Sequence, residues 1–392
     1  MNQDYTAIVV GGGPVGLASA CLLAIEGISV CLIAPVATPD LRTVALMQPA
    51  IRMLQHLGVW PGQLQQSSAA LRQLHIVDDT GNYATAPTLR FFAEEIAAET
   101  FGWNIPLSVL VPKLRDRVAE LNIPVISGRV RDFSSAIAGV TARIEDHGEV
   151  HAKVALAADG RHSLLRKSVG ITTTNHNWRQ RALISTFSHT VPHCAISTEH
   201  HRPGGLFTTV PLPGNHSSFV WMDRPEKIDA LVALPPEKLC TELQLASHGK
   251  LGRVYELGKS SSFDMQTTVA DQLAASRVFL VGEAAHGFPP IGAQGLNLSF
   301  RDAGHAADII VGADDPGSAA CCAAYHTARL PDVLPRNAAI SAMNWSLLAD
   351  NTAISGLRSL SLAMVDKVPA LRSWVVSQGL TPTVSLPLAM RA

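Results

Sequence analysis

The segment AIVVGGGPVGLASACLLAIEGISVCLIA, residues 7–34, decides the expected fold. Its apolar run Ala7–Val10 predicts a buried strand, and Ile28–Ile33 predicts a second one. Between them, the apolar stretch Leu17–Ile25 predicts a helix that is closed by Gly27. A strand, a helix and a strand in this order form a βαβ unit, which places the two strands in parallel in one sheet.

The turn between the first strand and the helix has the glycine spacing GxGxxG at Gly11, Gly13 and Gly16. In a dinucleotide-binding turn the first glycine makes the tight turn, the second lets a pyrophosphate approach and the third packs the helix on the strand. The free N–H groups of the helix N-terminus then attract the phosphates. The alternative is a glycine-rich turn without a ligand.

One expected feature of a dinucleotide site is missing. The acidic residue that would hold the adenosine ribose at the end of the second strand falls at Ala34, which has no side-chain acceptor. Because one neutral hydrogen bond is worth about 1 kcal/mol, we expect weaker cofactor retention rather than loss of binding. Asp40 is the nearby carboxylate that could substitute.

The composition of the 392-residue chain excludes several classes of function. Its net charge of −1 gives no positive field for nucleic acid, and no apolar run reaches the ~18 residues of a membrane span. The N-terminus has no export signal and the 6 cysteines show no CxxC spacing, so we expect reduced thiols and a cytoplasmic protein. Charged residues make up only 16% of the chain, which favours an apolar surface or cavity.

The histidines give no sign of a metal site. The pairs His189/His193 and His200/His201 lack a carboxylate or cysteine at ligand spacing in the sequence, so no metal is predicted.

Two further strand–turn–helix segments follow. The strand Val154–Ala158 runs into the turn Asp159–Gly160 and a short helical stretch. The strand Val278–Val281 is followed by Gly282-Glu283-Ala284-Ala285-His286, by the loop Pro289–Asn297 and by a helix from Leu298. Backbone N–H groups near Gly295–Asn297 can therefore point at an electron-rich ring edge.

These three motifs, in this order and spacing, resemble the class A flavoprotein monooxygenases of the p-hydroxybenzoate hydroxylase fold, over roughly residues 5–335. The stretches RTVALMQPAIRMLQHLGVW (42–60), ADGRHSLLRKSVGI (158–171) and GEAAHGFPPIGAQGLNLSFRDA (282–303) are most similar to the ubiquinone-biosynthesis hydroxylases. The resemblance implies FAD as cofactor, with the first motif on its ADP part and the Gly-Asp motif, here Gly282-Glu283, on the ribityl chain.

The resemblance also implies the site residues. Arg42 would lie near the flavin, although a solvated loop arginine is the alternative, and Pro290 would touch substrate or the reactive oxygen, although a rigid turn is equally expected. His286 corresponds to a position that is chiefly structural in the family. The full set of expected cofactor-binding residues is Gly11, Gly13, Gly16, Arg42, Asp159, Gly160, Gly282, Glu283, Pro289, Gly292, Gln294, Gly295, Leu296 and Asn297.

The expected fold class is α/β, with a Rossmann-like FAD-binding domain, an interleaved sheet-bearing substrate domain and a C-terminal helical region. The β-rich stretches between Thr172 and Thr268 supply the second sheet. The expected ranges are 1–75, 103–172 and 269–335 for FAD, 76–102 and 173–268 for substrate, and 336–392 for the helical region.

The C-terminal region allows two interpretations. Its apolar residues either pack in a core, which is the commoner outcome, or form a peripheral contact to the inner membrane face or to a quinone-biosynthesis complex. The residues of the second interpretation are Leu357, Leu360, Leu362, Met364, Leu371, Trp374 and Val375, with Arg358, Lys367 and Arg372 at the polar rim.

The expected function is FAD-dependent hydroxylation of the aromatic ring of a polyprenylated phenol in ubiquinone biosynthesis, with O2, through a C4a-hydroperoxyflavin. The sequence has no second GxGxxG, so the electrons come from transiently docked NAD(P)H or from a protein donor. Three alternatives stay open: a hydroxylase of a small soluble aromatic compound, a non-hydroxylating flavin oxidoreductase, and a non-catalytic binding protein on the same scaffold.

Overall fold

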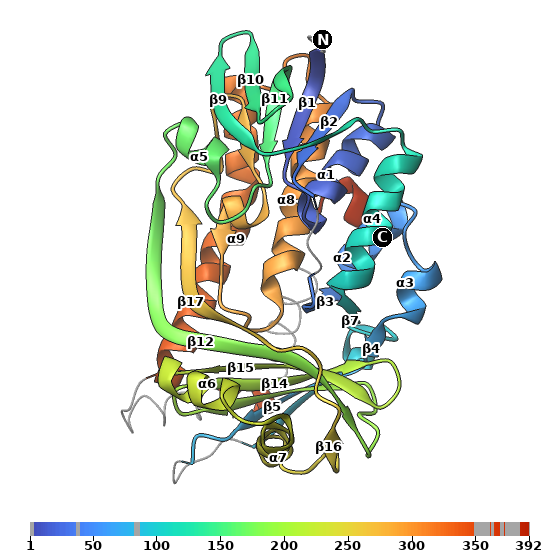
Figure 1. Ribbon diagram of the computed structural model, residues 1–392, viewed down its shortest axis with the longest axis vertical. Coiled ribbons are helices and arrows are strands. Elements are labelled where there is room, and N and C mark those ends of the chain that lie inside the picture. The colour runs from blue at the N-terminus through green and yellow to red at the C-terminus, as the bar shows by residue number, and fades with distance from the viewer. Residues whose placement is uncertain are drawn as a thin grey trace.

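The computed structural model describes residues 4–36, 40–81, 87–348, 361, 364–368, 372 and 385–391. Figure 1 shows two sheets stacked along the long axis, with the N-terminus at the outer end of the upper one. The long strands β12 and β17 run between the two levels, so the chain passes from one level to the other more than once.

The upper sheet is built around parallel strands in the order β8-β2-β1-β11-β19, with β18, β10 and β9 added in antiparallel pairs. Its central strands are continuous apolar runs because helices cover the sheet. The strands are β1 (Asp4–Val10), β2 (Val30–Ala34), β8 (Val125–Ser127), β9 (Val130–Ala136), β10 (Gly139–Ile144), β11 (Gly148–Ala157), β18 (Ala274–Ala275) and β19 (Val278–Leu280).

The lower sheet has the order β20-β17-β12-β15-β14-β13-β5-β6, with β16 paired to β12. Most of its pairs are antiparallel, and β13 with β5 is parallel. The strands are β5 (Gln73–Asp78), β6 (Leu89–Phe92), β12 (Thr173–His189), β13 (Ile196–Arg202), β14 (Gly205–Leu212), β15 (His216–Asp223), β16 (Val254–Tyr255), β17 (Ser261–Ala270) and β20 (His286–Gly287).

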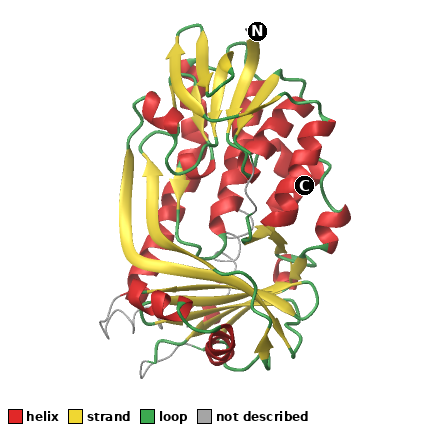
Figure 2. Ribbon diagram, in the orientation of Figure 1, coloured by secondary structure: helices red, strands yellow, loops and turns green. Residues whose placement is uncertain are grey.

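A small antiparallel sheet lies between the two levels, and Figure 2 shows helices around the upper sheet and below the lower one. The small sheet consists of β3 (Thr43–Met47), β7 (Gly102–Pro106) and β4 (Ala69–Leu71). The helices are α1 (Pro14–Ile25), α2 (Gln48–His56), α3 (Gly62–Gln66), α4 (Leu107–Glu120), α5 (Leu164–Ser168), α6 (Pro225–Val232), α7 (Pro236–Ala246), α8 (Gln294–Val311) and α9 (Ala319–Leu348), with 3₁₀ turns η1 (Ala93–Ile96), η2 (Gly282–Ala284) and η3 (Leu388–Met390).

The largest core joins the upper sheet to α1, α2, α4 and α8. Helix α1 is buried on most of its surface because its sequence is almost wholly apolar and it packs against both α8 and α4. A second core lies on the other side of the lower sheet, where α6 and α7 cover it. None of the described helices is long and apolar enough to cross a membrane.

The expected α/β fold class with a Rossmann-like sheet and a second sheet is confirmed. Of the expected helical region 336–392, α9 continues to Leu348, and most of the rest lies outside the described residues. The assignment of residue ranges to domains stays a prediction. Several expected boundaries shift by a few residues: β1 begins at Asp4 rather than Ala7, α1 at Pro14 rather than Leu17, β2 at Val30 rather than Ile28 and α8 at Gln294 rather than Leu298. An apolar pattern marks the end of an element poorly, above all beside glycines.

Only part of the C-terminal segment considered for membrane contact is described. Met364 is half exposed, whereas Arg372 pairs with Glu95 at 2.7 Å and lies over the Phe91 ring. Lys367 is exposed. Leu357, Arg358, Leu360, Leu362, Leu371, Trp374 and Val375 lie outside the described residues.

Candidate functional site

The glycine turn after β1 is closed by two close approaches that only glycine allows. A Cβ at Gly11, where φ is +129°, would lie 2.1 Å from the carbonyl oxygen of Ala158, and a Cβ at Gly16 would lie 2.0 Å from the carbonyl oxygen of Gly11. A Cβ at Gly13 would meet nothing within 4 Å, and this residue is exposed. The turn is therefore tight on its protein side and open on the side where a pyrophosphate would lie.

The second motif lies directly against this turn. Ala158 donates its N–H to the Val10 carbonyl at 2.8 Å, so the ends of β11 and β1 are neighbours. Asp159 accepts the Leu164 N–H on Oδ2 at 2.8 Å, which caps the turn into α5, while its buried Oδ1 has no partner among the described residues. Burial raises the pKa of this carboxyl, against the hydrogen bonds that it accepts.

The third motif reaches the same place from the far end of the chain. Val281 donates its N–H to the Ala157 carbonyl at 3.0 Å, and the position of a Cβ on Gly282 lies 3.4 Å from a methyl group of Val15 in α1. The buried guanidinium of Arg166 donates to the carbonyl of Ala284 at 2.7 Å and so ties the second motif to the third. The structure thus brings together all three motifs that the sequence singled out.

Helix α8 presents its first turn beside these segments. Its N-cap, Ala293, has the left-handed φ of 54°, and the N–H groups that a helix leaves without an intrahelical partner are here those of Ala293 to Leu296. Gly292 and Gly295 are exposed, and a Cβ on Gly295 would meet nothing within 4 Å. This turn can receive the electron-rich edge of a ring.

Two of the predicted site residues have side chains that hold the loop itself. Asn297 accepts the Met47 N–H at 2.9 Å and donates to the Ala45 carbonyl at 2.8 Å, which fixes α8 to β3. Gln294 accepts from Arg336 at 2.7 Å. Because these two side chains are engaged within the protein, a cofactor would contact this loop through backbone N–H groups.

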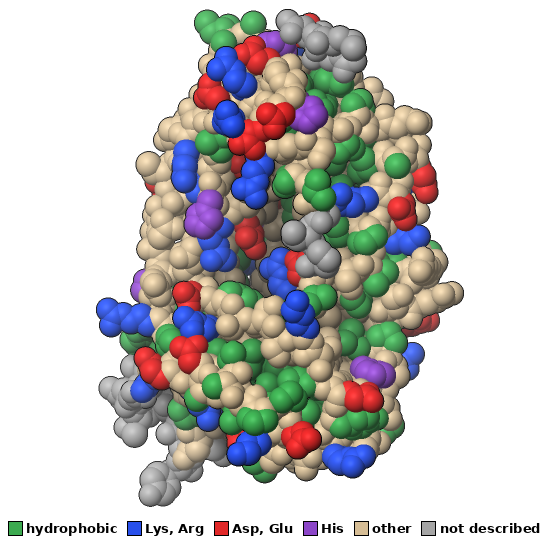
Figure 3. Space-filling view, viewed as in Figure 1, with side chains coloured by type: hydrophobic (Ala, Val, Ile, Leu, Met, Phe, Trp, Pro, Cys, Tyr) green, Lys and Arg blue, Asp and Glu red, His purple; other side chains and the backbone are tan. Residues whose placement is uncertain are grey.

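Arg42 lies at the start of β3 in a charged group. Its guanidinium donates to Asp40 at 2.6 Å, and this hydrogen bond raises the pKa of Arg42, against burial and with a further contribution from Glu283. Asp40, expected as a substitute acceptor for the ribose, already accepts three hydrogen bonds from the Arg42 side chain and one from its N–H. Figure 3 shows the molecule hollowed between its two levels, with acidic and basic side chains in the hollow.

A buried charged network under the third motif was missed in the sequence. Asp302 of α8 accepts from the Gly282 N–H at 3.1 Å, from His286 at 2.6 Å and from Arg329 at 2.8 Å. Burial alone would raise the pKa of Asp302, but His286 and Arg329 outweigh it and hold the pKa low. His286 is therefore part of the scaffold. Charged residues on the buried face of α8 were the signal that could have revealed this network.

Arg115 is a further residue of the candidate site that the sequence analysis did not identify. It comes from α4, and its Nη2 lies 3.2 Å from the position of a Cβ on Gly12. Its Nε is buried without a hydrogen-bond partner among the described residues. The Ala34 side chain lies 2.8 Å from that same position, so the residue that lacks a ribose acceptor and the Arg115 guanidinium lie beside the same glycine of the turn.

The loop Pro289–Pro290–Ile291 lies between two apolar clusters. Ile291 packs with Leu206 and Met222 of the lower sheet, while Ala293 packs in the cluster that contains Phe91. Pro290 itself is half-buried. The surroundings of this loop thus suit an apolar compound.

The geometry fits the FAD that the sequence predicts. An unpaired Arg115 nitrogen, an unpaired Asp159 oxygen and open space over Gly13, Gly160 and Gly295 lie along segments that contact one another. The remaining predicted residues differ in exposure: Glu283 is exposed, Leu296 is half-buried and Pro289 is buried. Which of these residues touch the cofactor stays a prediction.

The expectation that His200 and His201 have no companion carboxylate was wrong. His200 does have a companion carboxylate, Asp79, at 2.7 Å, and His201 has Glu199 at 2.8 Å. Asp79 precedes His200 by 121 positions, so no local spacing could show the pair.

Comparisons with known proteins agree with this geometry. The family described as FAD binding domain matches residues 4–333. Ubiquinone hydroxylase UbiL of Rhodospirillum rubrum is 30% identical over 378 residues, covering 93% of this chain and 87% of that protein. The 3-demethoxyubiquinol 3-hydroxylase of Escherichia coli is 29% identical, covering 81% and 82%. A crystal structure of HpxO from Klebsiella pneumoniae complexed with FAD has a TM-score of 0.76 at 18% identity, covering 96% and 99%.

Proposed function

The chain belongs to the FAD-binding class A flavoprotein monooxygenases, enzymes that hydroxylate aromatic rings, and from that premise we propose that its substrate is the ring of a polyprenylated phenol in ubiquinone biosynthesis. The observation that carries this choice is the 30% identity to a ubiquinone hydroxylase over 93% of the chain. The likeness covers the glycine turn, both later motifs and the second sheet, so it is not confined to the cofactor site.

The apolar surroundings of the reaction loop support the same substrate class. Ile291 and Ala293 each pack in an apolar cluster, one on either side of the exposed Gly292. A small aromatic acid would need a cationic anchor there, whereas a prenylated ring is held by burial of apolar surface.

The chain's own residues have three tasks in this reaction. Gly13, Asp159 and the first turn of α8 bind and orient FAD, and Arg115 supplies a positive charge beside the glycine turn. When bound and reduced, FAD supplies the activation of O2 that no side chain can perform. The loop Pro289–Ile291 positions the ring and keeps water away, since competing reactions with water would waste the activated oxygen.

The electron donor is part of the proposal. NAD(P)H docking transiently, or a protein donor, reduces the flavin. A peripheral contact to the membrane or to other quinone-biosynthesis proteins would bring an apolar substrate to the site, and the C-terminal segment is the region proposed for it.

The proposal is tested with the FAD-loaded full chain and two substrates, a polyprenylated phenol and its unprenylated soluble counterpart. We expect O2 consumption coupled to a product that carries one more ring oxygen with the prenylated compound, and mainly uncoupled peroxide with the soluble one. Coupled turnover of the soluble compound alone would contradict the substrate class. Oxidation of substrate without oxygen insertion would instead show a flavin dehydrogenase.

A cellular test is independent of the choice of donor. In a strain that lacks this protein, the quinone pool should fall and an intermediate lacking one ring hydroxyl should accumulate. An unchanged quinone pool would contradict a role in ubiquinone biosynthesis.

A further inference from the structure

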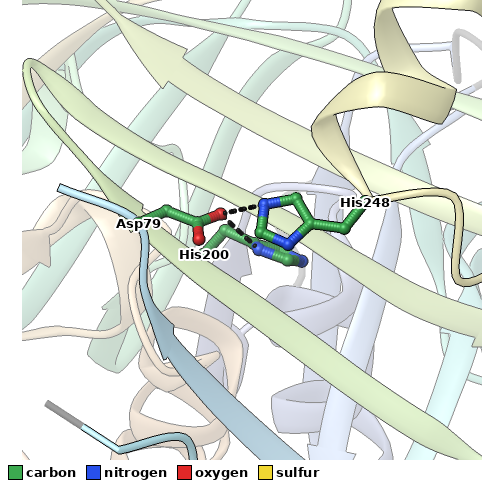
Figure 4. A group of neighbouring side chains, drawn as sticks. All are labelled: Asp79, His200 and His248. Atoms are coloured by element: carbon green, nitrogen blue, oxygen red, sulfur yellow. Dashed lines mark hydrogen bonds and ion pairs between the residues drawn. The ribbon is translucent and has the colours of Figure 1, made fainter. Parts of the chain in front are cut away.

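Three side chains with metal-ligating atoms converge at one end of the lower sheet. Oδ2 of Asp79 lies 2.7 Å from Nδ1 of His200 and 2.9 Å from Nε2 of His248 (Figure 4). One ligand atom from each lies within 4.8 Å of the others, and the residues that the structure describes contain no other such group of three.

Three separate elements build this group, so its geometry is set by the fold. Asp79 follows β5, and β5 pairs in parallel with β13, which carries His200 beside Val77. The Asp79 N–H also donates to the His201 carbonyl at 2.8 Å and fixes the end of β5. His248 follows α7 with a left-handed φ of 54°, a conformation that costs energy in a residue other than glycine and that turns the chain back toward Asp79.

We propose that Asp79, His200 and His248 form a binding site for a divalent transition-metal ion, Zn²⁺ in the first place. Two imidazoles and one carboxylate are a ligand set that zinc takes in tetrahedral sites, with a fourth position for water. The half-exposed side chain of His248 leaves the group open to solvent on one side, while His200 is 1% exposed and holds its ligand atom rigidly. Hard cations such as Ca²⁺ and Mg²⁺ would select an all-oxygen site instead.

Binding requires only small adjustments. In a tetrahedral zinc site with bonds of about 2.0–2.1 Å the ligand atoms are about 3.3 Å apart. The distances from Oδ2 of Asp79 to the two histidine nitrogens, 2.7 and 2.9 Å, would therefore lengthen by about half an ångström when the ion binds. Each imidazole must offer the ion the lone pair of the nitrogen that now faces Asp79, so its N–H must be on the other ring nitrogen in the metal-bound state.

Arg202 opposes the ion and limits its affinity. Its Nη2 lies 3.7 Å from the same Asp79 oxygen, which places a positive charge beside the site. The guanidinium is also held elsewhere, since it donates to the Ala246 carbonyl and lies over the rings of Phe207 and Trp221. Removal of this charge, in Arg202→Met, should therefore strengthen metal binding.

The site is separate from the flavin chemistry. The His200 ring lies beside Phe207, which belongs to the core that α6 and α7 cover. Neighbouring strand residues point to opposite faces, and Leu206 packs on the other face with Ile291 of the reaction loop. The ion would fasten α7 and β5 to β13 and so stabilise the lower sheet, without a part in the reaction.

The experiment is calorimetric titration of the FAD-loaded full chain with ZnCl2, after treatment with chelator. We expect one Zn²⁺ per chain and an increase in Tm with Zn²⁺. His248→Ala, at a half-exposed position, and Asp79→Asn should each weaken binding at least tenfold, and Arg202→Met should tighten it. His147→Ala, which removes an exposed histidine on the turn between β10 and β11, is the matched control and should change nothing.

The outcomes separate the alternatives. Zn²⁺ binding of equal affinity in the native chain, His248→Ala and Asp79→Asn would show binding by scattered surface histidines and would overturn the proposal. No binding at all would overturn it as well, and would leave a hydrogen-bonded cluster. Flavin absorbance and circular dichroism of each variant verify that the fold is retained, and neither readout depends on the hydroxylase activity.

Discussion

Replacing Gly13 by alanine separates the fold of the glycine turn from its function. Gly13 has φ −78° and ψ 174°, which alanine adopts without strain, and a Cβ there would meet nothing within 4 Å. Alanine lowers the entropy of the unfolded chain, worth about 0.4–1 kcal/mol, but it is a poorer N-cap than glycine by a similar amount. The free energy of unfolding of the apoprotein should therefore change by no more than about 0.5 kcal/mol.

FAD binding by the same variant should fall clearly. The new methyl group would occupy the open space through which a pyrophosphate must approach the backbone at Gly13. Inserting one carbon into a filled contact costs about 1–3 kcal/mol, which is roughly a 5- to 150-fold loss of affinity. Quenching of flavin fluorescence on titration measures the Kd, and urea unfolding of the apoprotein measures its stability.

Two further variants calibrate this result. Gly16→Ala would place a Cβ 2.0 Å from the Gly11 carbonyl oxygen, so it should destabilise the apoprotein as well as weaken FAD binding. Gly312→Ala lies at the far end of α8 with its nearest neighbour at 3.5 Å; it should leave FAD affinity unchanged and shift the unfolding free energy by no more than about 1 kcal/mol. Native affinity for FAD in Gly13→Ala would refute the argument that the pyrophosphate lies over this residue.

Three other predictions follow from the buried charges around the site. Asp302→Asn removes the charge that holds Arg329 and should lower the unfolding free energy by about 3–5 kcal/mol. The control Asp314→Asn, at an exposed position, should change the unfolding free energy by less than about 0.5 kcal/mol. Equal effects of the two variants in urea unfolding would contradict this prediction. Burial lowers the pKa of His305 to about 4, so the unfolded chain binds more protons between about pH 4 and 6.5 and stability should fall on acidification, by up to about 1.4 kcal/mol per pH unit. His305→Gln should flatten that part of the stability profile, and an unchanged slope would count against it. Arg115→Leu should weaken FAD binding about tenfold or more, because a charge-assisted hydrogen bond is worth about 1.5–3 kcal/mol. An unaltered Kd for FAD would show that the cofactor lies away from α4.

The local parts of the fold and site were predictable because short-range patterns encode them. The βαβ unit of residues 7–34 and the strand before Gly282 depend on apolar runs and glycine spacing, which a single sequence shows directly. The convergence of the three motifs was expected from the family resemblance alone, and in the structure it follows because the carboxyl ends of parallel strands meet at one edge of a sheet.

The parts that could not be predicted depend on partners distant in sequence. Asp302 and Arg329 are 27 residues apart on different helices, and no spacing rule relates them. The end of the chain returns to the upper level, where His305 contacts the carbonyl of Ser385 at 3.1 Å and Arg52 donates to the carbonyl of Met390 at 2.6 Å. Only the packed structure shows such contacts, because the sequence of residues 385–391 has no apolar period that requires them.

A crystal structure of the FAD-soaked protein would show whether three segments far apart in the chain hold one FAD. We expect one continuous FAD, with its pyrophosphate at Gly13, its course past Asp159 and its ring at the first turn of α8 near Gly295. FAD bound elsewhere on the molecule, or the absence of FAD from these three segments at saturating concentration, would contradict it.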